Sequence, residues 1–170
     1  MTQPNGLEVR PATIEEVGAV LDMERALAEY CHFDMNQFGL TEGKITSYVA
    51  DLTVHLLVAE QDAQLLGMVL ADESRTFNWS GARTLYVEDL YTAEAARGRG
   101  VGRALLAACS QQAIELAGRN PTAAEIRLDT HRFDNDATNA FYEAVGMKLE
   151  NNNWRLHGTA LVELATATPV

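Results

Sequence analysis

Hydrophobic positions repeat along this chain with two different periods, and these periods predict an alternation of strands and helices. Apolar residues spaced by three and four predict helices over residues 13–30, 41–51, 101–116 and 135–145. Short apolar runs predict strands over 7–10, 54–60, 65–73, 85–92 and 125–130, with a final strand pair over 147–150 and 154–164. The order β-α-α-β-β-β-α-β-α-β is typical of a mixed α/β (α+β) fold in which helices flank a central mixed sheet.

Boundary residues agree with this order of elements. Pro11 stops the first strand, Thr13-Ile14-Glu15-Glu16 is a capping-box pattern that opens the first helix, and Gly146 ends the last one. We find no internal repeat and no linker of biased composition. With 170 residues, 47% of them hydrophobic, the chain has the size and the apolar content of one domain spanning 1–170.

The net charge of the chain bears on which class of molecule it binds. A formal net charge of -11 argues against nucleic acid, whose phosphates are bound by Lys and Arg. An acidic protein also steers cationic small molecules toward its surface, although acidity often serves only solubility. The charge therefore supports a cationic small substrate without identifying one.

The cysteines, the histidines and the apolar runs predict that disulfides, metal sites and membrane segments are absent. Cys31 and Cys109 lie far apart and form no C-x-x-C pattern, so we expect two buried thiols and neither a disulfide nor a zinc site. The histidines, at 32, 55, 131 and 157, show no ligand spacing, which predicts no metal. The N-terminal residues lack an apolar signal core and no run of about 18 apolar residues occurs, so we expect a cytoplasmic protein without a membrane contact.

The run Arg97-Gly98-Arg99-Gly100-Val101-Gly102 joins a predicted strand to a predicted helix, and this placement favours an anion site. Glycines allow backbone amides to close around phosphate oxygens, and the start of the helix adds unpaired donors and partial positive charge. Arg103 adds a third arginine to the run. The structural alternative is a glycine-rich surface turn.

Other nucleotide motifs fit this run less well. A Walker A loop needs Lys-Ser/Thr after its last glycine, whereas this chain has Arg103-Ala104. A dinucleotide fingerprint needs G-x-G-x-x-G in an early strand-turn-helix unit, but this run is G-x-G-x-G and lies past the midpoint. Asp129, at the end of the next strand, lies where the dinucleotide fingerprint has its ribose-binding acid.

A second segment, Asn135 to Met147, carries the pattern N-x-x-[AST]-x-x-F-Y-x-x-x-G-[FM]. Together with the R-x-x-G-x-G run, it resembles the GNAT acetyltransferase superfamily, and within it the diamine (spermidine/spermine and thialysine) acetyltransferases. Three further segments share that resemblance: Arg10-Pro11-Ala12-Thr13, Val87-Glu88-Asp89-Leu90-Tyr91 and Trp154-Arg155-Leu156. The resemblance spans nearly the whole chain.

The resemblance implies acetyl-CoA as cosubstrate and a set of residues that hold it. The main chain of Leu90, Tyr91 and Thr92 would pair with the pantetheine arm as an added strand would. The pyrophosphate would bind the amides from Gly98 to Arg103, together with Arg97. This second group comprises Arg97, Gly98, Arg99, Gly100, Val101, Gly102 and Arg103. Asn135 and Thr138 would add side-chain contacts, although Asn135 alone would be an ordinary helix N-cap.

Acyl transfer to an amine needs a neutral nucleophile, an oxyanion donor and an acid for the leaving thiolate. Deprotonating an amine of pKa near 10.4 at pH 7 costs about 4.6 kcal/mol, which makes a positioned carboxylate useful. By resemblance Glu88 fills that role, the Leu90 amide is the oxyanion donor, and Tyr142 protonates the thiolate. The alternatives are an exposed strand acid for Glu88 and a tyrosine at the core margin for Tyr142.

The substrate side departs from the diamine group at one position. That group ends its first helix with a tyrosine-glutamate pair that contacts substrate, whereas this chain has Tyr30-Cys31. Tyr30 and Asp89, which lies on the opposite strand face from Glu88, remain candidate substrate contacts, and Glu29, His32 or Asp34 could replace the acid. The expected function is direct acetylation of a primary amine on a small cationic molecule, by a protein that the resemblance implies is a homodimer. The alternatives are protein or peptide N-acetylation and a non-catalytic coenzyme A sensor.

Overall fold

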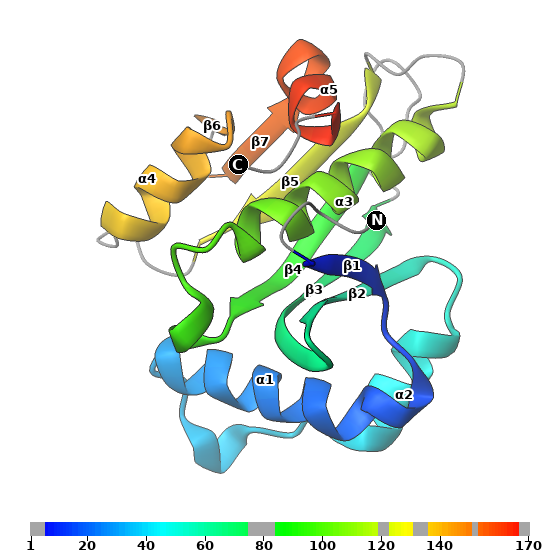
Figure 1. Ribbon diagram of the computed structural model, residues 1–170, viewed down its shortest axis with the longest axis vertical. Coiled ribbons are helices and arrows are strands. Elements are labelled where there is room, and N and C mark those ends of the chain that lie inside the picture. Colours follow the sequence, from blue (N-terminus) through cyan, green and yellow to red (C-terminus); the bar gives the residue numbers. More distant parts are fainter. Residues whose placement is uncertain (1–5, 75–83, 119–122, 131–135, 151–152, 167–170) are drawn as a thin grey trace. The chain divides into compact units, whose positions relative to one another are not determined.

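The strands of this protein are hydrogen-bonded in the order β1-β2-β3-β4-β5-β7-β6, in a mixed sheet that carries helices (Figure 1). The computed structural model describes residues 6–74, 84–118, 123–130, 136–150 and 153–166. The strands are β1 (Glu8–Pro11), β2 (Val54–Gln61), β3 (Gln64–Ser74), β4 (Thr84–Thr92), β5 (Glu125–Asp129), β6 (Lys148–Glu150) and β7 (Asn153–His157). The α-helices are α1 (Val17–Tyr30), α2 (Glu42–Ala50), α3 (Val101–Ala117), α4 (Asp136–Ala144) and α5 (Gly158–Thr166). Short 3-10 helices are η1 (Ile14–Glu16), η2 (Met35–Gln37) and η3 (Glu94–Ala96).

The chain divides into two compact units that share β3, β4 and α3. The first unit contains the described residues up to Leu70 and the segment Asp89–Leu105. The second contains the described residues of 71–88 and those from Leu106 onward. The predicted mixed α/β fold and its order of elements are confirmed as far as α4 and β6.

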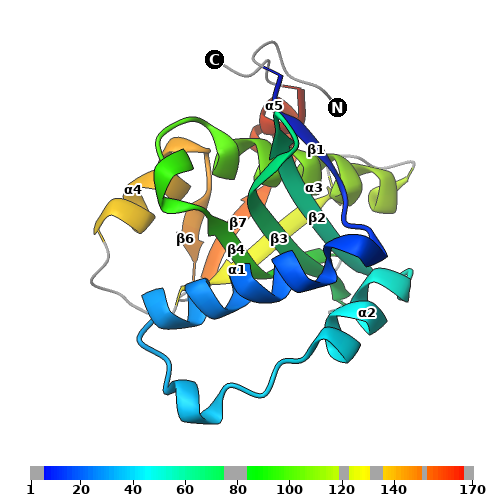
Figure 2. The ribbon, with the colours of Figure 1, turned by 60° about the horizontal axis from the view of Figure 1, so that its bottom comes forward.

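In the first unit, α1 and α2 pack on β2 and β3 (Figure 2). Their shared core contains Val17, Val20 and Leu21 from α1, Ile45 from α2, Leu56 and Val58 from β2, and Met68 and Leu70 from β3. β1 pairs with β2 in antiparallel register. β2 turns into β3 through Asp62 and Ala63, whose φ angles of 52° and 60° are those of a tight hairpin turn. The predicted apolar stripe of α1 is therefore buried against β2 and β3.

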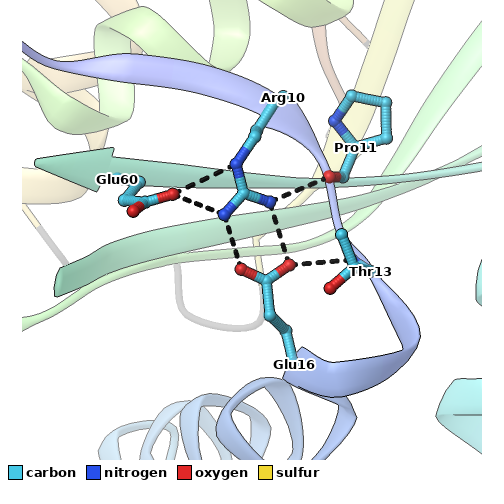
Figure 3. Close-up of polar contacts among 5 residues, drawn as sticks. All are labelled: Arg10, Pro11, Thr13, Glu16 and Glu60. Carbon is cyan, nitrogen blue, oxygen red and sulfur yellow. Dashed lines mark hydrogen bonds and ion pairs between the residues drawn. The ribbon is translucent and has the colours of Figure 1, made fainter. Parts of the chain in front are cut away.

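Arg10 ties the start of α1 to the sheet (Figure 3). Its guanidinium donates to Glu16 at 2.6 and 2.9 Å, to the Pro11 carbonyl at 3.2 Å and to Glu60, where its Nε lies 3.1 Å from Oε2. Glu16 also accepts the Thr13 amide at 2.8 Å. This reciprocal bond is the predicted capping box, although its residues form η1 instead of the first turn of α1. All five guanidinium N–H groups are thereby engaged.

The Arg10 contact predicts an acid-dependent stability. Hydrogen bonds from Arg10 lower the pKa of Glu16 to about 2, so this carboxylate stabilises the fold above its ordinary pKa of 4.5 and loses that effect as the pH falls toward 2. We expect Glu16→Gln to lower the free energy of unfolding by roughly 1–3 kcal/mol at pH 7, and by less at pH 3. Urea unfolding at both pH values measures this, with exposed Glu15→Gln as control. An equal loss at both pH values would contradict the ionic origin.

In the second unit, β5 pairs in parallel with β4 and antiparallel with β7, and β6 pairs with β7 at the edge (Figure 1). The predicted strand over 154–164 is wrong beyond His157, because Gly158, with φ +60°, ends β7 and α5 begins there. α5 buries Leu161, Leu164 and Ala165, which follow helical spacing, and it packs on β5 and β7. Gln111 donates to the Ala165 carbonyl at 2.9 Å and so fixes the end of the helix.

One of the two cysteine predictions is also wrong. Cys109 is buried in the apolar stripe of α3, and burial raises the pKa of its thiol to about 12. Cys31 is exposed, and it follows directly on Tyr30, the last residue of α1. The predicted loop over 31–40 contains only η2, with Asp34 capping it through the Asn36 amide at 3.1 Å.

Candidate active site

The glycine run forms an open loop between η3 and α3 in the first unit. Gly98 and Gly100 have φ angles of +73° and +83°, a region that glycine adopts without strain. An added Cβ at either position would meet nothing within 4 Å. Ala96 and Val101 are buried on either side of the loop and anchor it. The loop therefore presents its backbone to open space next to the first turn of α3. The amides of that first turn have no acceptor within the helix.

Two arginines of the run are held by neighbours in the first unit. Arg97 donates from Nε to the Thr92 carbonyl at 3.3 Å, and its Cζ lies 4.9 Å from the ring centroid of Tyr30. Arg99 donates to Oε1 of Gln61 at 2.6 Å. Arg97 thus joins the end of β4 to the end of α1, so that the predicted cofactor residues Thr92 and Arg97 and the predicted substrate residue Tyr30 lie together.

The C-terminal part of β4, which holds Leu90, Tyr91 and Thr92, approaches β3 at Gly67. A Cβ on Gly67 would lie 2.5 Å from the Tyr91 carbonyl oxygen, 3.2 Å from Val101 and 3.3 Å from the Cα of Thr92. Past this contact, the Ala93 amide donates to the Leu66 carbonyl at 2.9 Å. The sequence analysis missed Gly67, although a glycine inside a strand signals close backbone approach.

The parallel register of β4 and β5 runs from Thr84↔Glu125 to Val87↔Leu128. β4 itself continues to Thr92. The residues beyond this register, from Glu88 onward, include those expected to pair with the pantetheine arm.

Glu24 is a buried acid that the sequence analysis also missed. Only 6% of the residue is exposed, and Oε1 is buried without a hydrogen-bond partner among the described residues. Burial, and to a smaller extent the charge of Asp89 on β4, raises the pKa of Glu24 to about 8. The signal available in the sequence was its position, because residue 24 continues the apolar stripe of Val17, Val20 and Leu21.

Holding Glu24 in its ionised form inside this core costs on the order of 5 kcal/mol, given the distance between its ordinary pKa and a value of about 8. At pH 7 the side chain is therefore mostly protonated. Asp89 is half-buried, and Glu88, its neighbour on the other strand face, is exposed. Strand alternation thus separates the two acids as predicted.

Glu88 belongs to the second unit and lies among other acids there. The Tyr86 hydroxyl donates to Oδ2 of Asp129 at 2.8 Å. Burial, Asp129, Glu88 and Asp72 all raise the pKa of Tyr86, in that order of influence. The electrostatic environment of this tyrosine therefore contains three carboxylates, contributed by β3, β4 and β5.

Tyr142 is packed in the second unit and is 8% exposed. Its ring centroid lies 5.3 Å from that of Phe141 and 5.6 Å from that of Trp154. Thr138, on the same helix, is half-buried, whereas Asn135 lies outside the described residues. The ring of Tyr142 is thus buried next to two other aromatic rings, which suits a core residue and a positioned acid alike.

Two kinds of feature are absent from the described residues. Within that part of the chain, no group of three or more His, Cys, Asp or Glu side chains is placed to hold a metal ion. None of the helices described combines the length and the apolar character that a membrane crossing requires.

Residues 22–147 match the family model described as the Acetyltransferase (GNAT) family. The chain belongs to the GNAT acetyltransferase family. It is thus an acetyl-CoA-dependent N-acetyltransferase, and its mixed sheet with flanking helices is the GNAT fold. The open glycine loop lies beside the first turn of α3, and the loop and the helix start both offer backbone amides to an anion. This arrangement fits the diphosphate of acetyl-CoA.

Several solved structures share this GNAT fold. A PaiA N-acetyltransferase from Thermoplasma acidophilum in complex with coenzyme A is 17% identical, with a TM-score of 0.64 over 88% of this chain and 96% of that one. An aminoglycoside acetyltransferase from an uncultured soil metagenomic sample, in complex with sisomicin, is 15% identical, with a TM-score of 0.64 over 81% and 86%. A ribosomal-protein-alanine N-acetyltransferase from Brucella melitensis is 19% identical, with a TM-score of 0.68 over 88% and 99%. The search of curated proteins found no significant match.

Proposed function

We propose that this GNAT enzyme acetylates a primary amine of a small cationic substrate, a polyamine or a thialysine-like amino acid. The observation that carries the proposal is the acidic environment of Glu88, which acts on Tyr86 together with Asp72 and Asp129. Carboxylates gathered around one strand attract ammonium groups and repel anionic substrates. The net charge of -11 acts in the same direction at longer range.

We assign separate sets of residues to acetyl-CoA and to the amine substrate. Amides from Gly98 to Arg103, with the side chains of Arg97 and Arg99, bind the pyrophosphate, and the main chain of Leu90 to Thr92 orients the pantetheine arm. Asn135 and Thr138 add contacts to the same molecule, and Tyr30 and Asp89 contact the amine substrate.

The proton transfers fall to two side chains. Glu88 accepts the proton of the substrate ammonium, directly or through a water, and so frees the lone pair for direct attack on the thioester carbonyl. The Leu90 amide stabilises the oxyanion that develops there. The Tyr142 hydroxyl donates its proton to the leaving thiolate, a transfer that is uphill by about 2 kcal/mol and fits within an enzymatic barrier.

Fold alone does not choose the amine, since small-molecule and protein acetyltransferases share it. The charge of the substrate distinguishes small cationic amines from protein substrates. A second ammonium about 4 Å from a carboxylate gains about 4 kcal/mol at an effective dielectric of 20. Pairing into a homodimer and a cytoplasmic location stay predictions from the sequence.

A turnover assay that reports free thiol tests this proposal. We expect kcat/KM to be at least about 10²-fold higher for spermidine and thialysine than for a simple alkylamine, and we expect added salt to raise KM more for the polycations. Glu88→Gln should lower kcat/KM for the preferred amines, whereas the matched variant Glu115→Gln, at an exposed position on α3, should not. Equal efficiency across the amines would redirect the function to peptide amines. Acetyl-CoA binding without any turnover would indicate a sensor.

A further inference from the structure

Gly67 lies inside β3, in the stretch from Leu66 to Ala71 that is buried. A Cβ at this position would lie 2.5 Å from the carbonyl oxygen of Tyr91, whereas real Cβ atoms essentially never approach a neighbouring atom more closely than 3.0 Å. The φ angle of Gly67 lies outside the positive region, so the position does not require the conformational freedom of glycine. What it requires is the absence of a side chain.

A glycine at this position is unfavourable for the strand itself. β3 lies between β2 and β4 in the sheet, and its neighbouring residues Leu66 and Met68 are buried. Glycine inside a strand loses more conformational entropy on folding than other residues do, and it has no side chain to pack. The packing of β3 therefore does not explain Gly67, whereas the close approach of the Tyr91 carbonyl does.

Two further atoms lie close to the same position. A Cβ on Gly67 would lie 3.2 Å from Cγ1 of Val101, the first residue of α3, and 3.3 Å from the Cα of Thr92. The methyl group of Val101 belongs to a side chain and can yield by a few tenths of an ångström. The carbonyl of Tyr91 belongs to the main chain, so it can yield only if β4 moves with it.

The end of β4 is tied on both sides of the peptide that follows Thr92. The Ala93 amide donates to the Leu66 carbonyl at 2.9 Å, and Arg97 donates from Nε to the Thr92 carbonyl at 3.3 Å. A side chain at position 67 would have to increase the distance to the Tyr91 carbonyl from 2.5 Å to at least 3.0 Å. The main chain at the end of β4 would therefore shift relative to β3 by about 0.5 Å or more.

We propose that Gly67 is a positioning residue for acetyl-CoA: the space that it leaves sets where the main chain of Leu90, Tyr91 and Thr92 lies for pairing with the pantetheine arm. This inference rests on the proposed function, which assigns those three residues to the arm. Binding groups must be held within about 0.5 Å of their productive geometry, and a Cβ at position 67 would require a displacement at least that large. Gly67 acts through these residues and not by a contact of its own.

The experiment compares acetyl-CoA with 3′-phospho-ADP, which is coenzyme A without its pantetheine arm. In the wild type we expect titration calorimetry to give a lower Kd for acetyl-CoA, because the arm adds main-chain hydrogen bonds. In Gly67→Ala we expect the Kd for acetyl-CoA to rise at least about tenfold, while the Kd for 3′-phospho-ADP stays within about threefold. No amine is present, so the result does not depend on which amine the enzyme acetylates.

Gly43→Ala is the matched control, because it adds a Cβ to α2 where Oγ1 of Thr41 is 3.9 Å away. Both Kd values should stay at their wild-type levels in this variant. The double variant Gly67→Ala/Val101→Ala removes the valine methyl groups but keeps the contact with the Tyr91 carbonyl. Relative to Val101→Ala alone, it should show the same loss of acetyl-CoA affinity. Recovery of that affinity would assign the effect to the start of α3 and overturn the proposal.

The remaining outcomes separate this inference from the proposed function. Equal Kd values of the two ligands for the wild type would overturn the assignment of β4 to the pantetheine arm, and the role of Gly67 with it. A wild-type preference for acetyl-CoA that Gly67→Ala retains would overturn the positioning role alone. If Gly67→Ala loses both ligands, or does not fold, Gly67 is a packing residue.

Discussion

Acetyl-CoA is expected to raise the unfolding temperature of the wild-type protein and to leave that of Gly100→Asp nearly unchanged. A ligand that binds only the folded state adds RT ln(1 + [L]/Kd) to stability, so protection measures affinity. A side chain at position 100 would extend into the open space beside the loop, where we expect the diphosphate. A carboxylate about 5 Å from a phosphate charge costs about 3 kcal/mol at an effective dielectric of 20, which weakens binding roughly 10²-fold.

Gly100→Asn is the control for this experiment. Asparagine matches aspartate in shape and, like it, tolerates the positive φ of +83° at this position better than most residues. It should therefore keep much of the protection that the aspartate variant loses. NAD should protect neither the wild type nor the variants. Equal protection of both variants by acetyl-CoA, or protection by NAD, would show that the phosphates bind elsewhere.

The second large effect is expected at Tyr142. Replacing it with phenylalanine should lower kcat by roughly 10²- to 10⁴-fold, the usual range for the loss of a general acid. Affinity for acetyl-CoA and the unfolding temperature should change little, because the ring keeps its contacts with Phe141 and Trp154 at 5.3 and 5.6 Å. Steady-state kinetics and thermal unfolding of the same preparation measure both.

Tyr48→Phe provides the matched control, since it removes a tyrosine hydroxyl from α2, far along the chain from the proposed chemistry. Its kcat should remain near that of the wild type. If kcat of Tyr142→Phe also stays within a few-fold, Tyr142 is a packing residue and another group protonates the thiolate.

Periodicity was sufficient for most of the elements of this fold. The stripes of α1 and α3 and the short apolar runs of β2 to β5 each follow one period over many residues, and the corresponding predictions are confirmed. The exception is the segment 154–164, where a continuous apolar run suits either a strand or a buried helix. Gly158 was the residue that distinguished them, since its φ of +60° ends β7 and allows α5 to begin.

For the candidate site, the sequence indicates the features that depend on local motifs and misses those that depend on burial. The glycine loop and the strand from Val87 to Tyr91 follow from local patterns. Glu24 and Gly67 do not, because their importance comes from neighbours distant in sequence: Asp89 for the first, the Tyr91 carbonyl for the second. The catalytic roles of Glu88 and Tyr142, and the single-domain organisation, stay predictions.

The contact of Arg97 with Tyr30 has a thermodynamic consequence. The guanidinium is shared between the Thr92 carbonyl and the Tyr30 ring. If Arg97 bound a phosphate, its guanidinium would exchange the neutral Thr92 carbonyl for a charged acceptor. The Thr92 carbonyl and the Tyr30 ring would then both be released from Arg97. Because linkage between two binding equilibria is reciprocal, whatever factor the cosubstrate imposes on amine affinity through Tyr30, the amine must impose on cosubstrate affinity. One arginine would then set the degree of cooperativity between the two substrates.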